Sequence, residues 1–325
     1  MKTQIVYVVI SSDEDLFLEE LWASLYSLRL YHPEATVKVL VDAPTAKRIH
    51  EHTALDSMIT EVITVNVPED YSPTARSRVI KTTIRNVIDG RYLYIDTDTI
   101  ICHSLEDIDM LDCDIAAVPD VHLPLKDDPF NSSKRKKLKT AFGLDISDAE
   151  YFFNGGVMYV ADNELTRSFY HRWHENWKLY LIDNVRRADQ PPLFKTDKEF
   201  GYIIKRLPDV YNCQMTLSMR FFHEAYILHF FHMDFIKDQS YSPFVGQDIY
   251  REIKAAGSIT PHIDELIRHC KSTFQTPSMV IGKAQMDVLF SPFAQAFIPL
   301  YQDSRRWRSF LNWIAKKIIR CRKGK

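Results

Sequence analysis

With 325 residues, the chain is long enough for one large domain or two smaller ones, and its 46% hydrophobic and 26% charged residues are ordinary for a globular protein. A net charge of −2 gives no reason to expect a nucleic-acid partner, and no apolar run approaches the roughly 20 residues that cross a bilayer. The chain enters a predicted strand without a signal peptide, and its five scattered cysteines, without a CxxC pair, argue against disulfides and favour a reducing compartment, so we expect a cytoplasmic protein.

Strand and helix alternate over the first hundred residues. Apolar periodicity predicts strands at 5–10, 36–42 and 61–67 and a helix at 73–88. It also predicts a helix after the first strand, with an apolar face at Leu18, Leu21, Trp22, Leu25 and Leu28. Such alternation predicts an α/β fold with a mostly parallel sheet covered on both faces. Ligands bind to such sheets at the carboxyl ends of the strands, and Ser11, Ser12 and Asp13 follow the first strand directly.

The next predicted strand, YLYI at 92–95, ends in two carboxylates, Asp96 and Asp98. Because side chains alternate along a strand, positions 96 and 98 are expected on the same side. Neighbouring carboxylates repel each other unless a cation or a shared proton lies between them. Neither GxGxxG nor GxxxxGK occurs among the nine glycines, so a bound diphosphate would need a metal ion and cationic side chains.

Cationic side chains are present on the preceding helix, where Arg78, Lys81 and Arg85 recur at helical spacing opposite the apolar face. This pattern also suits a solvated basic face. Of the three, we expect Arg78 to reach the site.

Later segments are less regular. We expect strands at 114–120, 152–160 and 226–231, a helix at 164–182, and a long loop or lid at 121–150. The predicted domains are a catalytic domain at 1–240, a helical addition at 241–303 and a basic amphipathic tail at 304–325.

Five segments follow one another along the chain: YLYIDTDTII at 92–101, FFNGGVMYV at 152–160, ADQPPL at 188–193, LPDVYN at 207–212 and ILHF at 227–230. In this order they resemble the metal-binding DxD, the F-N-x-G-V strand, the D-Q element, the L-P-x-x-Y-N segment and the late histidine strand of glycosyltransferase family 8. The resemblance covers residues 5–237, and the family of retaining enzymes includes lipopolysaccharide galactosyl- and glucosyltransferases and glycogenin.

The resemblance implies a GT-A (Rossmann-like) enzyme with C-terminal helical additions. It would transfer a hexosyl unit from a UDP-sugar to a glycan or glycolipid hydroxyl with retention. It implies Asp96, Asp98 and His229 as ligands of Mn²⁺ or Mg²⁺, and this donor set suits manganese better than calcium. Asp189 and Gln190 would be catalytic residues at the reactive carbon of the sugar. The implied nucleotide-sugar contacts are Ser11, Ser12, Asp13, Arg78, Asp96, Thr97, Asp98, Asn154, Gly155 and Lys237.

One segment departs from the family pattern. Residues 229–238 are HFFHMDFIKD, where the family has H-F-x-G-x-x-K-P-W, so Lys237 stands eight residues after His229 rather than six. His232 is therefore an alternative third metal ligand. Retention through a nucleophile such as Asp189 and attack from the side of the leaving group both stay open.

Three alternative functions remain at this stage. They are an inverting DxD glycosyltransferase of another family, a haloacid-dehalogenase-like phosphatase that uses Asp96 and Asp98, and a non-catalytic nucleotide-sugar or glycan-binding protein. The phosphatase requires a second acidic pair after a later strand, and we find none that follows an apolar strand.

The C-terminal tail is strongly basic. Residues 304–325 hold nine Lys/Arg and no acidic residue, which leaves 32 basic against 43 acidic residues in the rest of the chain. Its apolar residues Trp307, Phe310, Leu311, Ile314 and Ile318 fall on one helical stripe. An apolar face opposite a basic one is typical of an interfacial helix. We therefore expect the tail to bind an anionic membrane surface, which places the protein on the inner face of the cell membrane.

Overall fold

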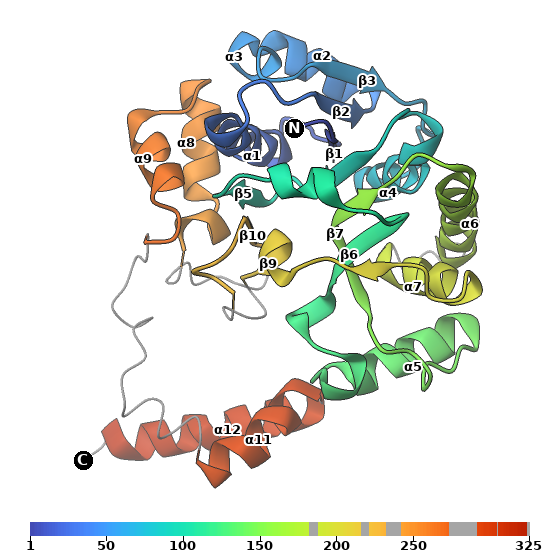
Figure 1. Cartoon of the computed structure of the whole chain (residues 1–325). Helices are drawn as coiled ribbons and strands as arrows, with labels where there is room; N and C mark the ends of the chain where they lie inside the picture. The colour runs from blue at the N-terminus through green and yellow to red at the C-terminus, as the bar shows by residue number, and fades with distance from the viewer. Residues whose placement is uncertain (182–187, 216–220, 232–241, 273–290, 304, 324–325) are drawn as a thin grey trace. The chain divides into compact units, whose positions relative to one another are not determined.

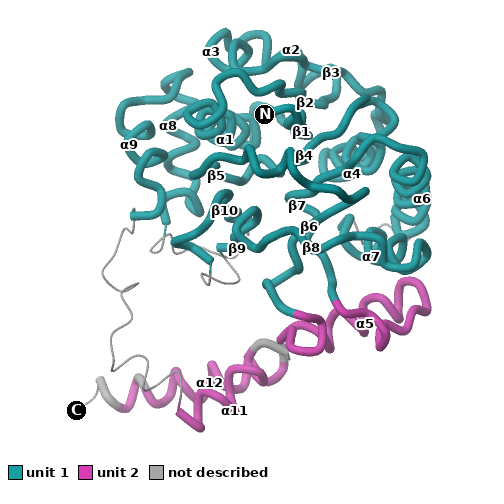
Figure 2. Tube along the Cα trace, in the orientation of Figure 1, with its two compact units in different colours: residues 1–123, 151–275 teal, residues 124–150, 276–325 magenta. Residues whose placement is uncertain are grey.

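The computed structural model describes residues 1–181, 188–215, 221–231, 242–272, 291–303 and 305–323 (Figure 1). The chain forms two compact units, unit 1 with residues 1–123 and 151–275 and unit 2 with residues 124–150 and 276–325 (Figure 2). The domain boundaries expected at residues 240 and 303 stay predictions.

Unit 1 is built on a seven-stranded sheet. Its order is β3 (Glu61–Thr64), β2 (Val37–Val41), β1 (Gln4–Val8), β4 (Tyr92–Ile95), β7 (Phe153–Val160), β6 (Ile115–Pro119) and β8 (Lys205–Arg206). Only β7 runs antiparallel to its neighbours β4 and β6. The central strands are buried on both faces, which explains their continuous apolar sequence. This sheet confirms the predicted mostly parallel α/β class.

Helices cover both faces of this sheet (Figure 1). Alternate residues of β1 enter separate cores, with Ile5 and Tyr7 on one side and Val6 and Val8 on the other. The helices of the first side are α1 (Phe17–Tyr31), α2 (Ala43–Glu51), α3 (Thr53–Asp56), α8 (Asp248–Ala256) and α9 (Pro261–Arg268). Those of the second side are α4 (Pro73–Thr83), α6 (Glu164–Leu181) and α7 (Gln190–Glu199).

A second, three-stranded sheet lies on the α1 side. It consists of β5 (Thr99–Ile101), β10 (Ile227–His229) and β9 (Cys213–Gln214). Here β5 follows β4 after a three-residue bend, so Asp96 and Asp98 lie in this bend rather than along a strand as predicted. Because β10 runs antiparallel to β5 with His229 opposite Thr99, the histidine lies beside the bend. Short 3-10 helices connect these elements at Ile84–Asn86, Glu106–Met110, Asp120–His122, Asp209–Asn212 and Pro243–Val245.

Unit 2 contains α5 (Asn131–Phe142), α11 (Pro292–Asp303), α12 (Arg305–Lys323) and a 3-10 turn at Leu125–Asp127. The prediction of a long loop at 121–150 is wrong, because α5 occupies its centre. Lysine, arginine and leucine are good helix formers, and Gly143 closes α5 in the left-handed conformation at φ 66°. None of the described helices is long and apolar enough to cross a membrane.

Candidate active site

Asp96, Asp98 and His229 form a compact group at the carboxyl end of β4. One ligand atom from each lies within 4.8 Å of the others. His229 Nε2 is 3.1 Å from Asp98 Oδ1 and 3.9 Å from Asp96 Oδ2. Burial lowers the pKa of His229, but the charge and hydrogen bond of Asp98 and the charge of Asp96 together outweigh burial, and the pKa is raised above its ordinary value. The arrangement therefore favours positive charge between the imidazole and the carboxylates.

The other nitrogen of the imidazole, Nδ1, has a hydrogen-bond partner. His229 Nδ1 lies 2.9 Å from Asn212 Oδ1, whereas buried Nε2 makes no hydrogen bond of normal geometry with the described residues. Two carboxylate groups and an imidazole nitrogen directed at one point are a donor set that suits a divalent metal ion. These three residues therefore fit a divalent metal ion.

A second charged cluster adjoins the first and is centred on Lys81, a residue we did not predict for the site. Its Nζ lies 3.1 Å from Asp96 Oδ1 and 2.9 Å from Asp189 Oδ2, and 4.7 Å from the centre of the Tyr94 ring. The Tyr94 hydroxyl donates to Asp96 Oδ1. With only 2% of its surface exposed, Lys81 does not belong to the solvated basic face that its helical spacing also allowed.

Arg78, which we did expect at the site, approaches Asp189 with Nε at 3.5 Å from Oδ1. Burial of the Asp189 carboxyl favours its neutral form, but the charges of Arg78 and Lys81 outweigh burial and lower its pKa. Arg85, the third cation of the series, donates instead to backbone carbonyl groups such as that of Gly90. Asp189 is therefore an ionised carboxylate held between two cations.

A pocket of about 430 Å³ opens onto these clusters. Its lining includes the predicted residues Arg78, Asp96, Thr97, Asp98 and His229. The other lining residues come from the ends of β1 and β4, from α1 and α4, and from the residues after β10. They are Val8, Val9, Ile10, Phe17, Glu20, Pro73, Thr74, Ser77, Tyr94 and Phe231. It therefore lies at the carboxyl ends of parallel strands, where an α/β sheet binds ligands.

Ser11, Ser12 and Asp13 form the loop between β1 and α1, next to pocket residue Ile10. Arg48 holds this loop, with NH1 2.8 Å from Ser11 Oγ and Nε 3.2 Å from Asp13 Oδ1. Lys254 of α8 adds hydrogen bonds of 2.7 and 2.8 Å to the carbonyl oxygens of Asp13 and Asp15. The loop is thus fixed from two helices.

Asn154, Gly155 and Gln190, which we predicted for the site, are not among the residues that line this pocket. Asn154 Nδ2 and Gln190 Nε2 approach the same oxygen, Asp120 Oδ1, at 3.3 and 3.4 Å. Asp120 was not predicted for the site, and its position after β6 is the signal that could have found it. Lys237 and His232 lie outside the described residues.

The two glycines of FNGGV, Gly155 and Gly156, differ in the space that a side chain would have. A Cβ on Gly156 would lie 2.2 Å from His229 Cε1 and 2.9 Å from Asp96 Oδ2. A Cβ on Gly155, which we predicted to contact the nucleotide sugar, would meet its nearest neighbour at 3.6 Å, an ordinary contact. Gly156 is therefore the glycine that makes room for the imidazole, and the contact of Gly155 with the sugar stays a prediction.

We expect Gly156→Ala to displace His229 and to weaken Mn²⁺ binding at least about tenfold, since the added methyl group occupies the place of the ring. Gly155→Ala is the matched control and should bind Mn²⁺ like the wild type. Calorimetric titration of both variants measures this. Equal affinities for the two alanine variants would contradict the assignment of His229 as a ligand.

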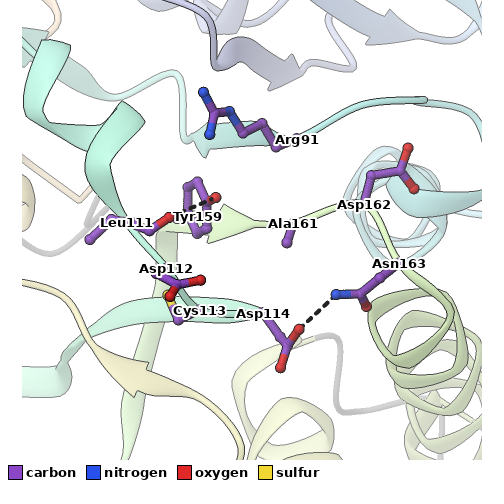
Figure 3. Close-up of a pocket in the computed structure, with 9 residues that line it drawn as sticks. All are labelled: Arg91, Leu111, Asp112, Cys113, Asp114, Tyr159, Ala161, Asp162 and Asn163. Atoms are coloured by element: carbon purple, nitrogen blue, oxygen red, sulfur yellow. Dashed lines mark hydrogen bonds between the residues drawn. The ribbon is translucent and has the colours of Figure 1, made fainter.

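A second pocket, of about 560 Å³, lies at the opposite edge of the sheet (Figure 3). It is lined by residues that precede β4 and β6 and follow β7, such as Arg91, Asp114 and Asn163. Asn163 Nδ2 donates to Asp114 Oδ1 at 2.6 Å across it. None of the predicted site residues lines this pocket, so it is not the candidate active site.

A mostly parallel sheet with a carboxylate bend after its central strand and a histidine facing that bend define a glycosyltransferase of the GT-A class. The chain belongs to glycosyl transferase family 8, whose sequence model matches residues 8–233. This membership confirms the predicted family and enzyme class and decides against the phosphatase and the non-catalytic binding protein. No curated protein matches the chain.

Solved structures of glycosyltransferases are similar in fold. An active-site mutant of the galactosyltransferase LgtC has a TM-score of 0.53 at 15% identity, covering 82% of this chain and 99% of that one. LgtC in complex with donor and acceptor sugar analogs gives 0.51 at 15% identity, covering 81% and 99%. The glycosyltransferase GlyE of Streptococcus pneumoniae gives 0.50 at 17% identity, covering 87% and 68%. These likenesses support the GT-A fold.

Proposed function

We propose that the protein transfers a hexosyl unit from a UDP-sugar to a hydroxyl of a glycan or glycolipid, with retention and with Mn²⁺ as the preferred ion. The observation that carries this proposal is the convergence of Asp96, Asp98 and Nε2 of His229 on one point of the pocket. A divalent cation held there would neutralise the charge that grows on the leaving diphosphate. Membership of family 8 supports a nucleotide-sugar donor and a glycan acceptor.

The residues around this point have distinct proposed tasks. Arg78 lines the pocket and faces the diphosphate or the sugar, and Thr97 lies in the bend between the two metal-ligating carboxylates. The loop of Ser11, Ser12 and Asp13 would contact the uridine. Asn154 and Gly155 would support the sugar from behind, and Gln190 would orient the acceptor or the reacting sugar.

Asp189 is a poor candidate for a nucleophile. Its carboxylate is paired with both Lys81 and Arg78, and its lowered pKa makes it a weak base. A carboxylate stabilised in this way attacks carbon reluctantly, which favours attack by the acceptor from the side of the leaving group. Asp189 would then hold Arg78 and Lys81 in place beside the diphosphate.

The experiment that tests the proposal is hydrolysis of a set of UDP-sugars by the purified protein with Mn²⁺, followed as release of UDP. We expect slow turnover of one or a few UDP-hexoses without acceptor and faster turnover once a suitable glycan is added. Absence of turnover for every UDP-sugar, together with turnover of another nucleotide sugar, would contradict the UDP donor. The anomeric configuration of the product, determined by NMR, tests retention.

We also propose that α12 binds an anionic membrane surface on the inner face of the cell membrane, where a lipid-linked acceptor would be found. Trp307, Phe310 and Trp313 form an exposed aromatic row on this helix, with Ile318 beyond it. Trp313 thus joins the predicted stripe, whereas Leu311 and Ile314 are half-buried. The basic side chains of Arg308, Lys316, Lys317 and Arg320 are also exposed. Exposed aromatic and basic side chains on one helix suit an interface with anionic lipid.

Removal of the tail tests this proposal. We expect full-length protein to co-sediment with anionic vesicles at moderate salt, and a chain ending at Ser304 to stay in the supernatant. A full-length variant with serine at positions 307, 310 and 313 should also lose binding, because it keeps the basic charge but lacks the aromatic row. Equal sedimentation of all three proteins would rule out α12 as the anchor.

A further inference from the structure

The orientation of His229 is fixed by a chain of hydrogen bonds that begins at a backbone group. The amide of Gly156 donates to Asn154 Oδ1 at 2.9 Å. Asn212 Nδ2 lies 2.9 Å from the same oxygen, and Asn212 Oδ1 lies 2.9 Å from His229 Nδ1. The chain thus runs from β7 through the 3-10 helix before β9 to the end of β10.

The donor and acceptor character of each group fixes the direction of every hydrogen bond in this series. A backbone amide can only donate, so the atom of Asn154 that meets it must be the oxygen. The Asn212 atom that faces this oxygen must then be the NH₂ group, which turns the Asn212 oxygen toward His229. An oxygen accepts, so His229 Nδ1 must carry a hydrogen. In the neutral imidazole the lone pair is then on Nε2, the atom that points at Asp96 and Asp98.

The residues that form this series of hydrogen bonds are buried. Asn212 is 0% exposed, His229 1% and Asn154 4%. These hydrogen bonds are buried, so the carboxamide of Asn212 is the partner that holds a hydrogen on Nδ1 and leaves Nε2 to face the carboxylates. Beyond Asn154 the network continues to Asp120 and from there to Gln190.

We propose that Asn212 is a positioning residue that presents Nε2 of His229 to the metal ion and, through Asn154, ties the metal site to the Asp120–Gln190 pair. This inference rests on the proposed function, since it assumes a divalent ion at Asp96, Asp98 and His229. Partners that orient a ligating histidine in this way typically raise metal affinity by about 10–100-fold. Asn212 itself touches neither metal nor substrate.

Two substitutions in the full-length protein separate the two halves of the proposal. Asn212→Asp keeps an oxygen that accepts from Nδ1–H but loses the donor to Asn154. We expect it to bind Mn²⁺ within about threefold of the wild type while kcat falls at least about tenfold. Asn212→Leu loses both bonds, so we expect its Mn²⁺ affinity to fall about 10–100-fold as well.

The control is Asn176→Leu. Asn176 is as buried as Asn212, but its Nδ2 donates hydrogen bonds to Thr196 and Glu199 in α7. It should lower the melting temperature without changing Mn²⁺ affinity. The readout is titration of Mn²⁺ into nucleotide-free protein by calorimetry, with folding checked by circular dichroism.

Wild-type affinity in Asn212→Leu would overturn the inference and leave the proposed function intact. If Asn212→Leu does not fold, a loss of Mn²⁺ affinity beyond about tenfold in folded Asn212→Asp would overturn it too. Failure of the wild type to bind Mn²⁺ or Mg²⁺ would instead contradict the proposed function.

Discussion

Lys81→Met is expected to lower the free energy of unfolding by about 3–5 kcal/mol at pH 7, because removing one partner of a buried ion pair leaves the other charges uncompensated. Lys81 is the cation between Asp96 and Asp189, which lie 3.1 and 2.9 Å from its Nζ. Methionine keeps the apolar stem but not the charge. Urea denaturation followed by tryptophan fluorescence measures the loss.

The loss should depend on pH. The pKa of Asp189 is lowered in the folded state, so its contribution to stability is present above the unfolded carboxyl pKa of about 4 and is lost as the pH falls toward the folded value. The difference between wild type and Lys81→Met should therefore shrink below about pH 4.

A lysine in an exposed pair is the control for this prediction. Lys178 lies 2.9 Å from Glu175 on the surface, and Lys178→Met should cost less than about 1 kcal/mol. Equal losses for Lys81→Met and Lys178→Met would show that the buried cluster does not hold the fold together.

Asp98→Asn is expected to lower turnover of the donor sugar by at least about 100-fold while the protein stays folded, because one metal ligand is lost where leaving-group charge must be stabilised. The chain offers a matched control in a second D-x-D pair, Asp112 and Asp114. Asp112 is exposed and lies at the opposite edge of the sheet, so Asp112→Asn should keep full activity. Full activity of Asp98→Asn, or of the wild type in excess EDTA, would contradict metal-assisted transfer.

Much of the fold follows from local sequence patterns. Strands β1, β2, β4 and β7 lie where apolar runs predict them. The motif order led to His229 although β4 ends at residue 95 and β10 begins at residue 227. The bend at Asp96 and Asp98 could not be predicted from the sequence. Side chains two residues apart lie on the same side both along a strand and in a turn between two strands, so the D-x-D spacing fits either structure. Basic residues within 121–150 suggested a loop because solvated helices and loops share a polar composition.

Lys81 and Asn212 show why part of the site escaped prediction. Helical spacing places Lys81 on a basic face, but only the tertiary packing that brings Tyr94 and Asp189 against Lys81 shows that its side chain is buried. Asn212 belongs to the LPDVYN motif and ends a 3-10 helix, whereas its partner His229 lies in β10. Tertiary packing determines which buried polar groups form hydrogen bonds with each other. A sequence motif can therefore point to such residues but does not show what each of them does.

The central claim is that Asp96, Asp98 and His229 hold a metal ion that binds the diphosphate of the donor. The most direct measurement is titration of UDP into the wild-type protein by calorimetry, once with Mn²⁺ and once with excess EDTA. We expect UDP to bind with Mn²⁺ and its affinity to fall at least about tenfold in EDTA, because the diphosphate would then meet Arg78 without the charge of a metal ion. Equal affinity under both conditions would contradict the claim.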